Sequence, residues 1–301
     1  MTLQYLSRLR IPVIAAMVMA VVMPACTLGD SNDDTRTEVT VSIDPQRYIL
    51  EQIAGPGTLK INTLIEPGAD PETYEPSMSR RMATDRSAAY FTIGTLPFEQ
   101  AVTSSVGDGV RVVDTSEGIK LMYGTHSHPA GACAHQHHEA PDPHTWSSVA
   151  NVRTMARTMT RTLCELIPDS AAVFVRRAKA FDLRLDSLDS LIRSRVPQGT
   201  AFAIWHPSLS YFARDYGLHQ IAIGQETKDF SVRSLKAVID SARSRTDASD
   251  GPLEVFFCQK EFDTRQAETV NRALDARLVT IYPLAYDWEA EMLRIADELG
   301  K

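Results

Sequence analysis

The sequence predicts an α/β protein with two lobes of mostly parallel sheet, joined by one long rigid helix. Short β-branched runs alternate with helical patterns in both halves of the chain, which is typical of βαβ units with parallel strands. The alternation is interrupted once, by a long helical pattern in the middle of the sequence. The series on either side of this pattern are similar in length, so we expect two lobes of similar size.

Residues 1–25 are excluded from the fold because they are typical of a secretory signal peptide. Two arginines precede IPVIAAMVMAVVM, an apolar run of 13 residues that is short for a membrane span. The following MPAC resembles a bacterial lipobox, which predicts lipidation of Cys26; a plain secreted protein is the alternative. Residues 26–37 are polar and lack apolar periodicity, so we expect a flexible tether between the lipid anchor and the folded body.

The N-terminal lobe is predicted at residues 38–167. Its strands and helices are expected where period-two apolar runs alternate with helical spacing. The predicted strands are 38–43, 58–64, 89–93 and 110–113, and the predicted helices are 46–54, 78–86 and a segment after Pro97.

The linking helix is predicted at residues 168–197. Its apolar side chains recur every three or four residues, from Phe174 to Ile192, as one face of a helix requires. Pro168 precedes the pattern, Asp169 is the expected N-cap, and Pro197 follows it. A helix of about 28 residues would be about 42 Å long, long enough to run beside both lobes.

The C-terminal lobe is predicted at residues 198–301, with a second series of alternating elements. The predicted strands are 200–205, 219–223, 253–258 and 277–282, and the predicted helices begin at Ser208, Ser231, Thr264 and Trp288.

Charge and cysteine content exclude two classes. The chain has a formal net charge of −7 at pH 7, so nucleic acid is not an expected partner. After Cys26, three cysteines remain, Cys133, Cys164 and Cys258. Three is an odd number and predicts no disulfide framework. Cys164 and Cys258 lie in apolar runs and are expected to be buried.

Candidate functional residues follow the predicted strands, where ligands bind in open α/β sheets. Glu72 and Glu75 follow the second strand, His144 lies before the linking helix, and His206 follows the first strand of the second lobe. Two histidines and a carboxylate from separate loops form a ligand set that Zn²⁺ prefers. Taken alone, each of these histidine motifs more often marks a structural histidine than a ligand.

Six stretches of the sequence carry a family resemblance: GADPETYEPS (68–77), TIGTLPFE (92–99), DPHTWSS (142–148), HPSLSYFARDYGL (206–218), QKEFDTRQAETV (259–270) and YPLAYDW (282–288). In this order they resemble the metal-binding class of ABC-transporter solute-binding proteins, the zinc and manganese receptors. The resemblance covers residues 38–301 and implies two α/β lobes, a long joining helix and a metal site in the cleft between the lobes.

The resemblance implies that His144 and His206 are metal ligands. Two departures from the family pattern concern the other ligands. Glu72 stands where many members have histidine, and a carboxylate there is expected to coordinate as well. Tyr282 stands where many members have an aspartate ligand, and a neutral phenol is a weak ligand. Asp287 or a bound water is therefore expected to complete the coordination sphere, with Tyr282 as a further alternative. A capping role at the N-terminus of the final helix is the favoured alternative for Asp287.

A histidine-rich loop is predicted at residues 125–139. Zinc-specific members of the family carry such a loop just before the Asp-Pro-His ligand motif. We expect it to collect or sense zinc through weak, exchangeable imidazole contacts, with Cys133 as a further donor; an exposed loop that binds nothing is the alternative. Its histidines are His126, His128, His135, His137 and His138.

The predicted function is that of an extracytoplasmic lipoprotein receptor in the periplasm or at the cell surface, and not an enzyme. It would bind Zn²⁺ as a monomer and deliver it to a membrane permease driven by a cytoplasmic ATPase. A manganese or iron receptor of the same fold is the main alternative, because these receptors favour more carboxylate ligands and Glu72 supplies one in place of a histidine. A zinc hydrolase with Glu75 as the base, and a surface adhesin, are the alternatives from other classes.

Overall fold

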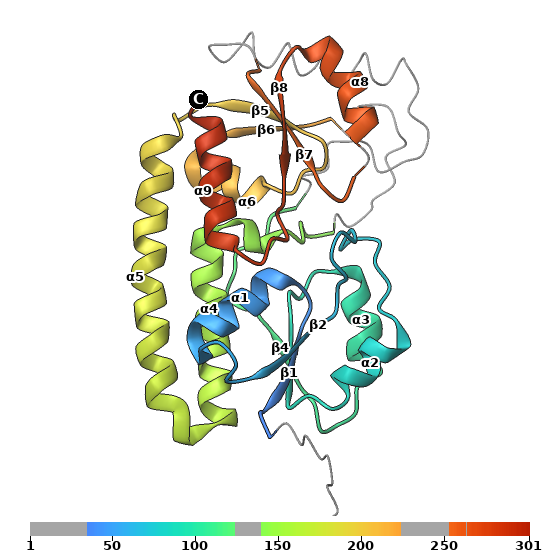
Figure 1. Cartoon of the computed structure of the whole chain (residues 1–301), viewed down its shortest axis with the longest axis vertical. Coiled ribbons are helices and arrows are strands. Elements are labelled where there is room, and N and C mark those ends of the chain that lie inside the picture. Colours follow the sequence, from blue (N-terminus) through green and yellow to red (C-terminus); the bar gives the residue numbers. More distant parts are fainter. Residues whose placement is uncertain (1–34, 124–139, 224–252, 263) are drawn as a thin grey trace, which may run out of the picture. The chain divides into compact units, whose positions relative to one another are not determined.

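The N-terminal lobe is built on a four-stranded sheet in the order β2-β1-β3-β4, with every neighbouring pair parallel (Figure 1). The computed structural model describes residues 35–123, 140–223, 253–262 and 264–301. In this lobe the elements are β1 (Glu38–Val41), α1 (Asp44–Ala54), β2 (Lys60–Thr63), α2 (Met78–Thr84), β3 (Ala89–Thr92), α3 (Pro97–Thr103) and β4 (Arg111–Asp114). The predicted alternation is confirmed; β1, β2 and β3 are shorter than expected, and β4 is shifted by one residue.

The C-terminal lobe repeats this arrangement, with four parallel strands in the order β6-β5-β7-β8. The common strand order confirms the prediction of two similar lobes. The predicted helix from Ser231 lies outside the described residues. The elements are β5 (Ala201–Ile204), α6 (Ser210–Tyr216), β6 (His219–Ala222), β7 (Val255–Gln259), α8 (Thr264–Leu274), β8 (Arg277–Ile281) and α9 (Trp288–Leu299).

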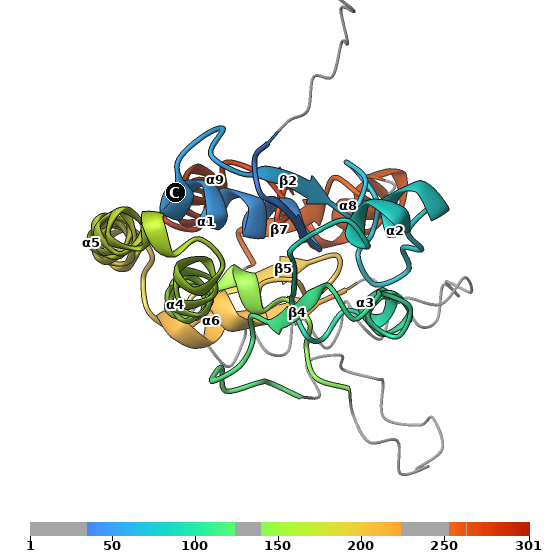
Figure 2. The same ribbon diagram turned by 90° about the horizontal axis from the view of Figure 1, so that it is seen from below.

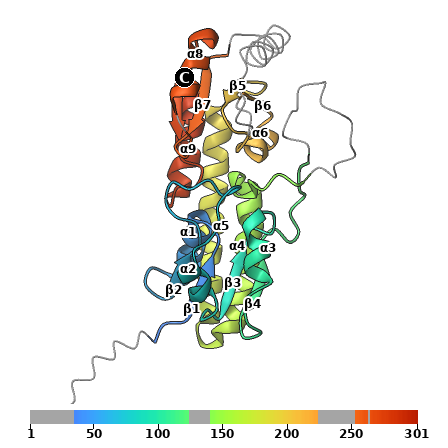
Figure 3. The ribbon, with the colours of Figure 1, turned by 90° about the vertical axis from the view of Figure 1, so that its right-hand side faces the viewer.

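The long helix between the lobes is α5 (Ala171–Arg195). It packs against α1 and α4 of the N-terminal lobe and against α9 of the C-terminal lobe (Figures 1 and 3). Its start differs from the prediction, because residues Pro168–Ser170 form a 3₁₀ turn and Ser170, not Asp169, is the N-cap. It ends at Arg195 because Pro197 forces the preceding Val196 into an extended conformation.

The 18-residue helix α4 (Val149–Leu166) is not among the predicted elements. It lies beside α5, and Figure 2 shows both on one side of the lobe, with α2 and α3 on the other. Ser148 caps its N-terminus by accepting a hydrogen bond from the backbone N–H of Asn151 at 3.1 Å. Its buried face includes Val152, Met159 and Leu163.

Buried apolar residues of both lobes form one continuous core cluster, which extends from Val39 in β1 to Leu299 in α9. Alternate residues of β5 face opposite ways, as a strand requires. Phe202 and Ile204 belong to this shared core, whereas Ala203 and Trp205 belong to a second cluster confined to the C-terminal lobe. The shared core therefore lies on the sheet face that α5 and α9 cover.

Residues 36–301 form one compact unit. Within the described residues, no helix combines the length and the apolar character needed to cross a membrane. The signal peptide with Cys26, and the histidine-rich loop with Cys133, lie outside the described residues. Of the other cysteines, Cys258 is buried as expected and Cys164 is partly exposed.

Candidate metal centre

His144 is held in place by a carboxylate two residues earlier in the chain. It is only 2% exposed and precedes the 3₁₀ turn Thr145–Ser147. Asp142 Oδ1 lies 2.9 Å from both the backbone N–H and the ring Nδ1 of His144. When Nδ1 carries the proton and donates a hydrogen bond to Asp142, Nε2 is left with a free lone pair. Nε2 is the atom that faces the other site residues.

The charge of Asp142 changes the protonation of both groups. Burial raises the pKa of Asp142, but its contacts with His144 outweigh burial and hold this pKa well below its usual range. Burial lowers the pKa of His144, but the hydrogen bond and charge of Asp142 outweigh it and raise this pKa above its ordinary value of 6.5. Asp142 thus makes His144 more basic, so that its Nε2 lone pair binds a proton or a metal ion more strongly.

His206 is positioned by the neighbouring strand. It follows β5 and is 7% exposed. Its backbone N–H donates to Gln259 Oε1 at 3.3 Å, and Gln259 Nε2 donates to the His206 carbonyl and, at 2.6 Å, to Ser208 Oγ. The ring of Phe262 stacks on the imidazole with 5.4 Å between the ring centroids. The end of β7 therefore fixes both the backbone and the ring of His206.

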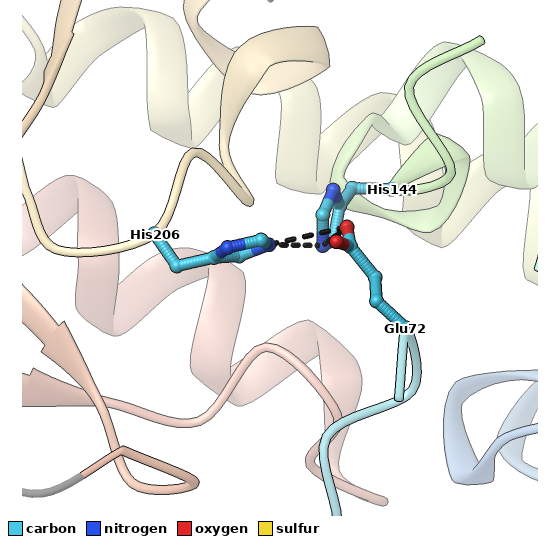
Figure 4. Close-up of side chains that lie close together, drawn as sticks. All are labelled: Glu72, His144 and His206. Atoms are coloured by element: carbon cyan, nitrogen blue, oxygen red, sulfur yellow. Dashed lines mark hydrogen bonds and ion pairs between the residues drawn. The ribbon is translucent and has the colours of Figure 1, made fainter. Parts of the chain in front are cut away.

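Glu72 lies in the loop between β2 and α2. The backbone N–H of Glu72 and the hydroxyl of Thr73 both donate to Asp70, to Oδ1 and Oδ2 respectively, at 3.0 Å each. This turn between Asp70 and Thr73 is a local structure that an Asx residue favours. It directs the Glu72 side chain toward the two histidines (Figure 4).

The three side chains meet at their donor atoms (Figure 4). The two Nε2 atoms of His144 and His206 lie 3.2 Å apart, and Glu72 Oε1 lies 3.6 Å from the first and 3.2 Å from the second. A tetrahedral ion with bonds of about 2.0–2.1 Å separates its ligand atoms by about 3.3 Å. The spacing of the three donors therefore fits one zinc-sized ion, and the residues present fit its preferred ligand types.

A small cavity of about 20 Å³ adjoins the histidines, room for about one water-sized particle. Trp146 lines it, whereas Trp205, next to His206, belongs to the second core cluster. Its remaining lining residues include Asp70, Ser208, Gln259, Glu261, Pro283 and Leu284. Burial and the charge of Asp70 raise the pKa of Glu261.

The predicted Glu72, His144 and His206 come together, but Asp287 does not join them. Among the described residues, the group of metal-binding side chains within 4.8 Å of one another is these three. Asp287 instead caps α9, where its carboxylate accepts a hydrogen bond from the backbone N–H of Ala290. The structure therefore does not bring Asp287, expected as a fourth ligand, to the other three residues. The helix-capping alternative accounts for it.

Several other expectations have a clear outcome. Tyr282 is 39% exposed and does not line the cavity. Glu75 is exposed and outside the ligand group, and the same holds for His219. The five histidines of the 125–139 loop lie outside the described residues.

Sequence analysis missed Asp142, Gln259 and Glu261. Asp142 had a signal, because it lies two residues before His144 in a Pro-containing turn. Gln259 and Glu261 lie in the matching stretch 259–270, but nothing in that stretch indicates their relation to His206, which arises from the pairing of β5 with β7.

Comparison with known proteins identifies the family. The family model for the zinc-uptake complex component A, periplasmic (ZnuA), matches residues 39–294. A putative metal-binding protein of Chlamydia trachomatis is 28% identical over 273 residues, 90% of this chain and 93% of the relative. The manganese-binding lipoprotein MntA of Halalkalibacterium halodurans is 25% identical over 216 residues, 69% of this chain and 68% of the relative.

A solved structure agrees with the same assignment. The crystal structure of a ZnuA deletion mutant with zinc bound is 30% identical, covers 88% of this chain and 97% of its own, and has a TM-score of 0.74. The matching family consists of periplasmic metal-binding transport receptors and not enzymes, which excludes the hydrolase alternative. With two parallel-sheet lobes and a match over most of its length, the chain belongs to the periplasmic zinc-uptake complex component A (ZnuA) family of metal-binding solute receptors.

Proposed function

We propose that the protein captures Zn²⁺ outside the cytoplasm through Glu72, His144 and His206 and delivers it to the permease of an ABC transporter. The observation that carries this proposal is the spacing of the three donor atoms, 3.2 to 3.6 Å. Two nearly buried imidazoles and a carboxylate at this spacing match the arrangement that an ion with bonds of about 2 Å needs.

The choice of zinc rests on the donor types and on a related structure. Two imidazole nitrogens and one carboxylate suit Zn²⁺, whereas Mn²⁺ and Fe²⁺ receptors favour more carboxylates. The zinc-bound ZnuA structure is a relative at 30% identity, which supports zinc as the cargo. A manganese receptor remains the second candidate, because MntA is also a relative and Glu72 supplies a carboxylate.

Transport requires that the ion can leave as well as bind. Glu72 and His144 belong to the N-terminal lobe, and His206 to the C-terminal lobe. A small separation of the lobes would therefore divide the ligand set and weaken binding. Receptors of this family work with a membrane permease and its ATPase, and contact with the permease is the event we propose for this release.

Two further parts of the proposal, the lipid anchor and the histidine-rich loop, are supported by the sequence alone. We propose that Cys26 carries lipid and keeps a monomeric receptor at the membrane surface. Residues 125–139 would bring zinc to the main site through weak contacts of their five histidines.

The test is a zinc titration of the full chain by calorimetry, with Mn²⁺ as competitor. Three proteins are compared: wild type, the double variant His144→Ala with His206→Ala, and a deletion of residues 125–139. One tight site that disappears in the double variant, with weaker sites that disappear in the deletion, is expected. Tight binding that survives in the double variant would refute the assignment of the site.

A further inference from the structure

Neither Tyr282 nor Asp287, the two side chains considered as a fourth ligand, lies with Glu72, His144 and His206. The ring of Tyr282 contacts two cations, with Lys260 Nζ 5.2 Å and Arg294 Cζ 5.7 Å from the ring centroid. Asp287 is engaged at the N-terminus of α9. Neither residue lines the cavity beside the histidines.

Glu261 is the carboxylate of the C-terminal lobe that does line this cavity. β5 pairs with β7 so that Ile204 lies opposite Phe257. Continuing this register puts His206 opposite Gln259, and the hydrogen bonds between these two residues agree with it. Glu261 follows two residues later, in the turn after β7 and directly before Phe262, whose ring stacks on His206.

The neighbouring polar side chains that line the cavity already form hydrogen bonds within the protein. Both oxygens of Asp70 accept hydrogen bonds within the turn that carries Glu72. The amide of Gln259 is used by His206 and Ser208. Glu261 is half-buried, and a charged carboxylate in such a place is costly unless a cation or a donor balances it.

We propose that Glu261 is the fourth ligand of the bound ion and determines how strongly the site prefers zinc over manganese. This inference rests on the proposed function. Glu261 lies outside the group whose donor atoms are within 4.8 Å of one another. Its carboxylate therefore has to move toward Glu72 and the histidines, and the turn after β7 is the segment that moves.

A site of two imidazoles and two carboxylates has a specific chemical consequence. Its two negative charges balance a divalent cation, and its second carboxylate is a hard donor that Mn²⁺ needs more than Zn²⁺ does. Removing the charge of Glu261 should therefore raise the preference for zinc, because manganese loses more affinity than zinc.

The experiment compares the full chain with the variants Glu261→Gln and Glu268→Gln. Glu268 is an exposed residue of the nearby helix α8 and serves as the matched control. Dissociation constants for Zn²⁺ and Mn²⁺ are measured by chelator competition, and the ligands of bound zinc are determined by X-ray absorption spectroscopy. Glutamine retains the size of glutamate, so that folding is little affected.

The expected result is a loss of Mn²⁺ affinity of at least about tenfold in Glu261→Gln, a smaller loss for Zn²⁺, and a changed zinc absorption spectrum. Glu268→Gln should behave as wild type. Equal losses for both metals with an unchanged spectrum, or no loss at all, would overturn the role of Glu261 while the three-residue site stands. Tight binding in a variant without His144 and His206 would instead overturn the proposed function itself.

Discussion

Asp142 is the residue on which the orientation of His144 depends. Its Oδ1 accepts from both the ring and the backbone of His144, at 2.9 Å each. We expect Asp142→Ala to weaken zinc binding by about 10- to 100-fold, as loss of a carboxylate behind a metal-binding histidine usually does. The measurement is chelator competition at pH 7.5.

The control for this variant is Asp108→Ala, which removes an exposed aspartate from the same lobe. Comparing the two separates the effect on His144 from a general loss of negative charge. If both variants bind zinc equally well, Asp142 does not position the ligand.

At the residue scale, sequence analysis could find ligands but not the groups that hold them. Glu72, His144 and His206 follow recognisable motifs in strand-following loops, and they do come together. Gln259 and Glu261 lie 53 and 55 residues beyond His206 in the sequence, and only the β5–β7 pairing brings them near it. A contact that depends on strand register leaves no local pattern in a single sequence.

At the scale of the elements, the stability of helix α9 shows whether Asp287 acts as a helix cap or as a metal ligand. Its N-terminus is capped by the Asp287 carboxylate, which accepts from the backbone N–H of Ala290 at 3.4 Å. We expect Asp287→Ala to lower the free energy of unfolding by about 1 kcal/mol and to leave zinc affinity unchanged. Urea unfolding and chelator competition measure the two quantities.

Asp287→Asn is the informative comparison for this position, because asparagine is an equally good cap. It should restore the stability and bind zinc as wild type does. A large loss of zinc affinity in both variants would return Asp287 to the ligand set.

The elements themselves were predictable to different degrees. Strands with β-branched residues and helices flanked by proline are found close to their predicted positions, as β1 and α5 illustrate. Helix α4 was missed although Val152, Met159 and Leu163 form a buried face. Arginine and threonine residues between them dilute the apolar pattern, and the packing of α4 against α5 stabilises a helix that its local sequence indicates only weakly.

At the scale of the whole molecule, the two lobes share one apolar core. The cluster that contains Val39 of the N-terminal sheet also contains Phe202 of the C-terminal sheet and Trp288 of α9. Two indole hydrogen bonds reinforce this junction. Trp146 Nε1 donates to the carbonyl of Pro283 at 3.0 Å, and Trp288 Nε1 donates to the carbonyl of Trp146 at 2.9 Å. Separating the lobes completely would expose the shared apolar surface to water and break both hydrogen bonds.

This shared core predicts that both lobes unfold together and that zinc stabilises them as one unit. Zinc that binds only the folded chain adds about 4 kcal/mol when its free concentration is 1,000 times Kd, which corresponds to a rise in Tm of roughly 10 °C for a chain of this size. Calorimetry should record one transition that moves upward with zinc, does not move with Mg²⁺, and does not move in the variant without His144 and His206. Two separate transitions, with only one sensitive to zinc, would mean that the ion is held within a single lobe and that His206 does not share it with Glu72 and His144.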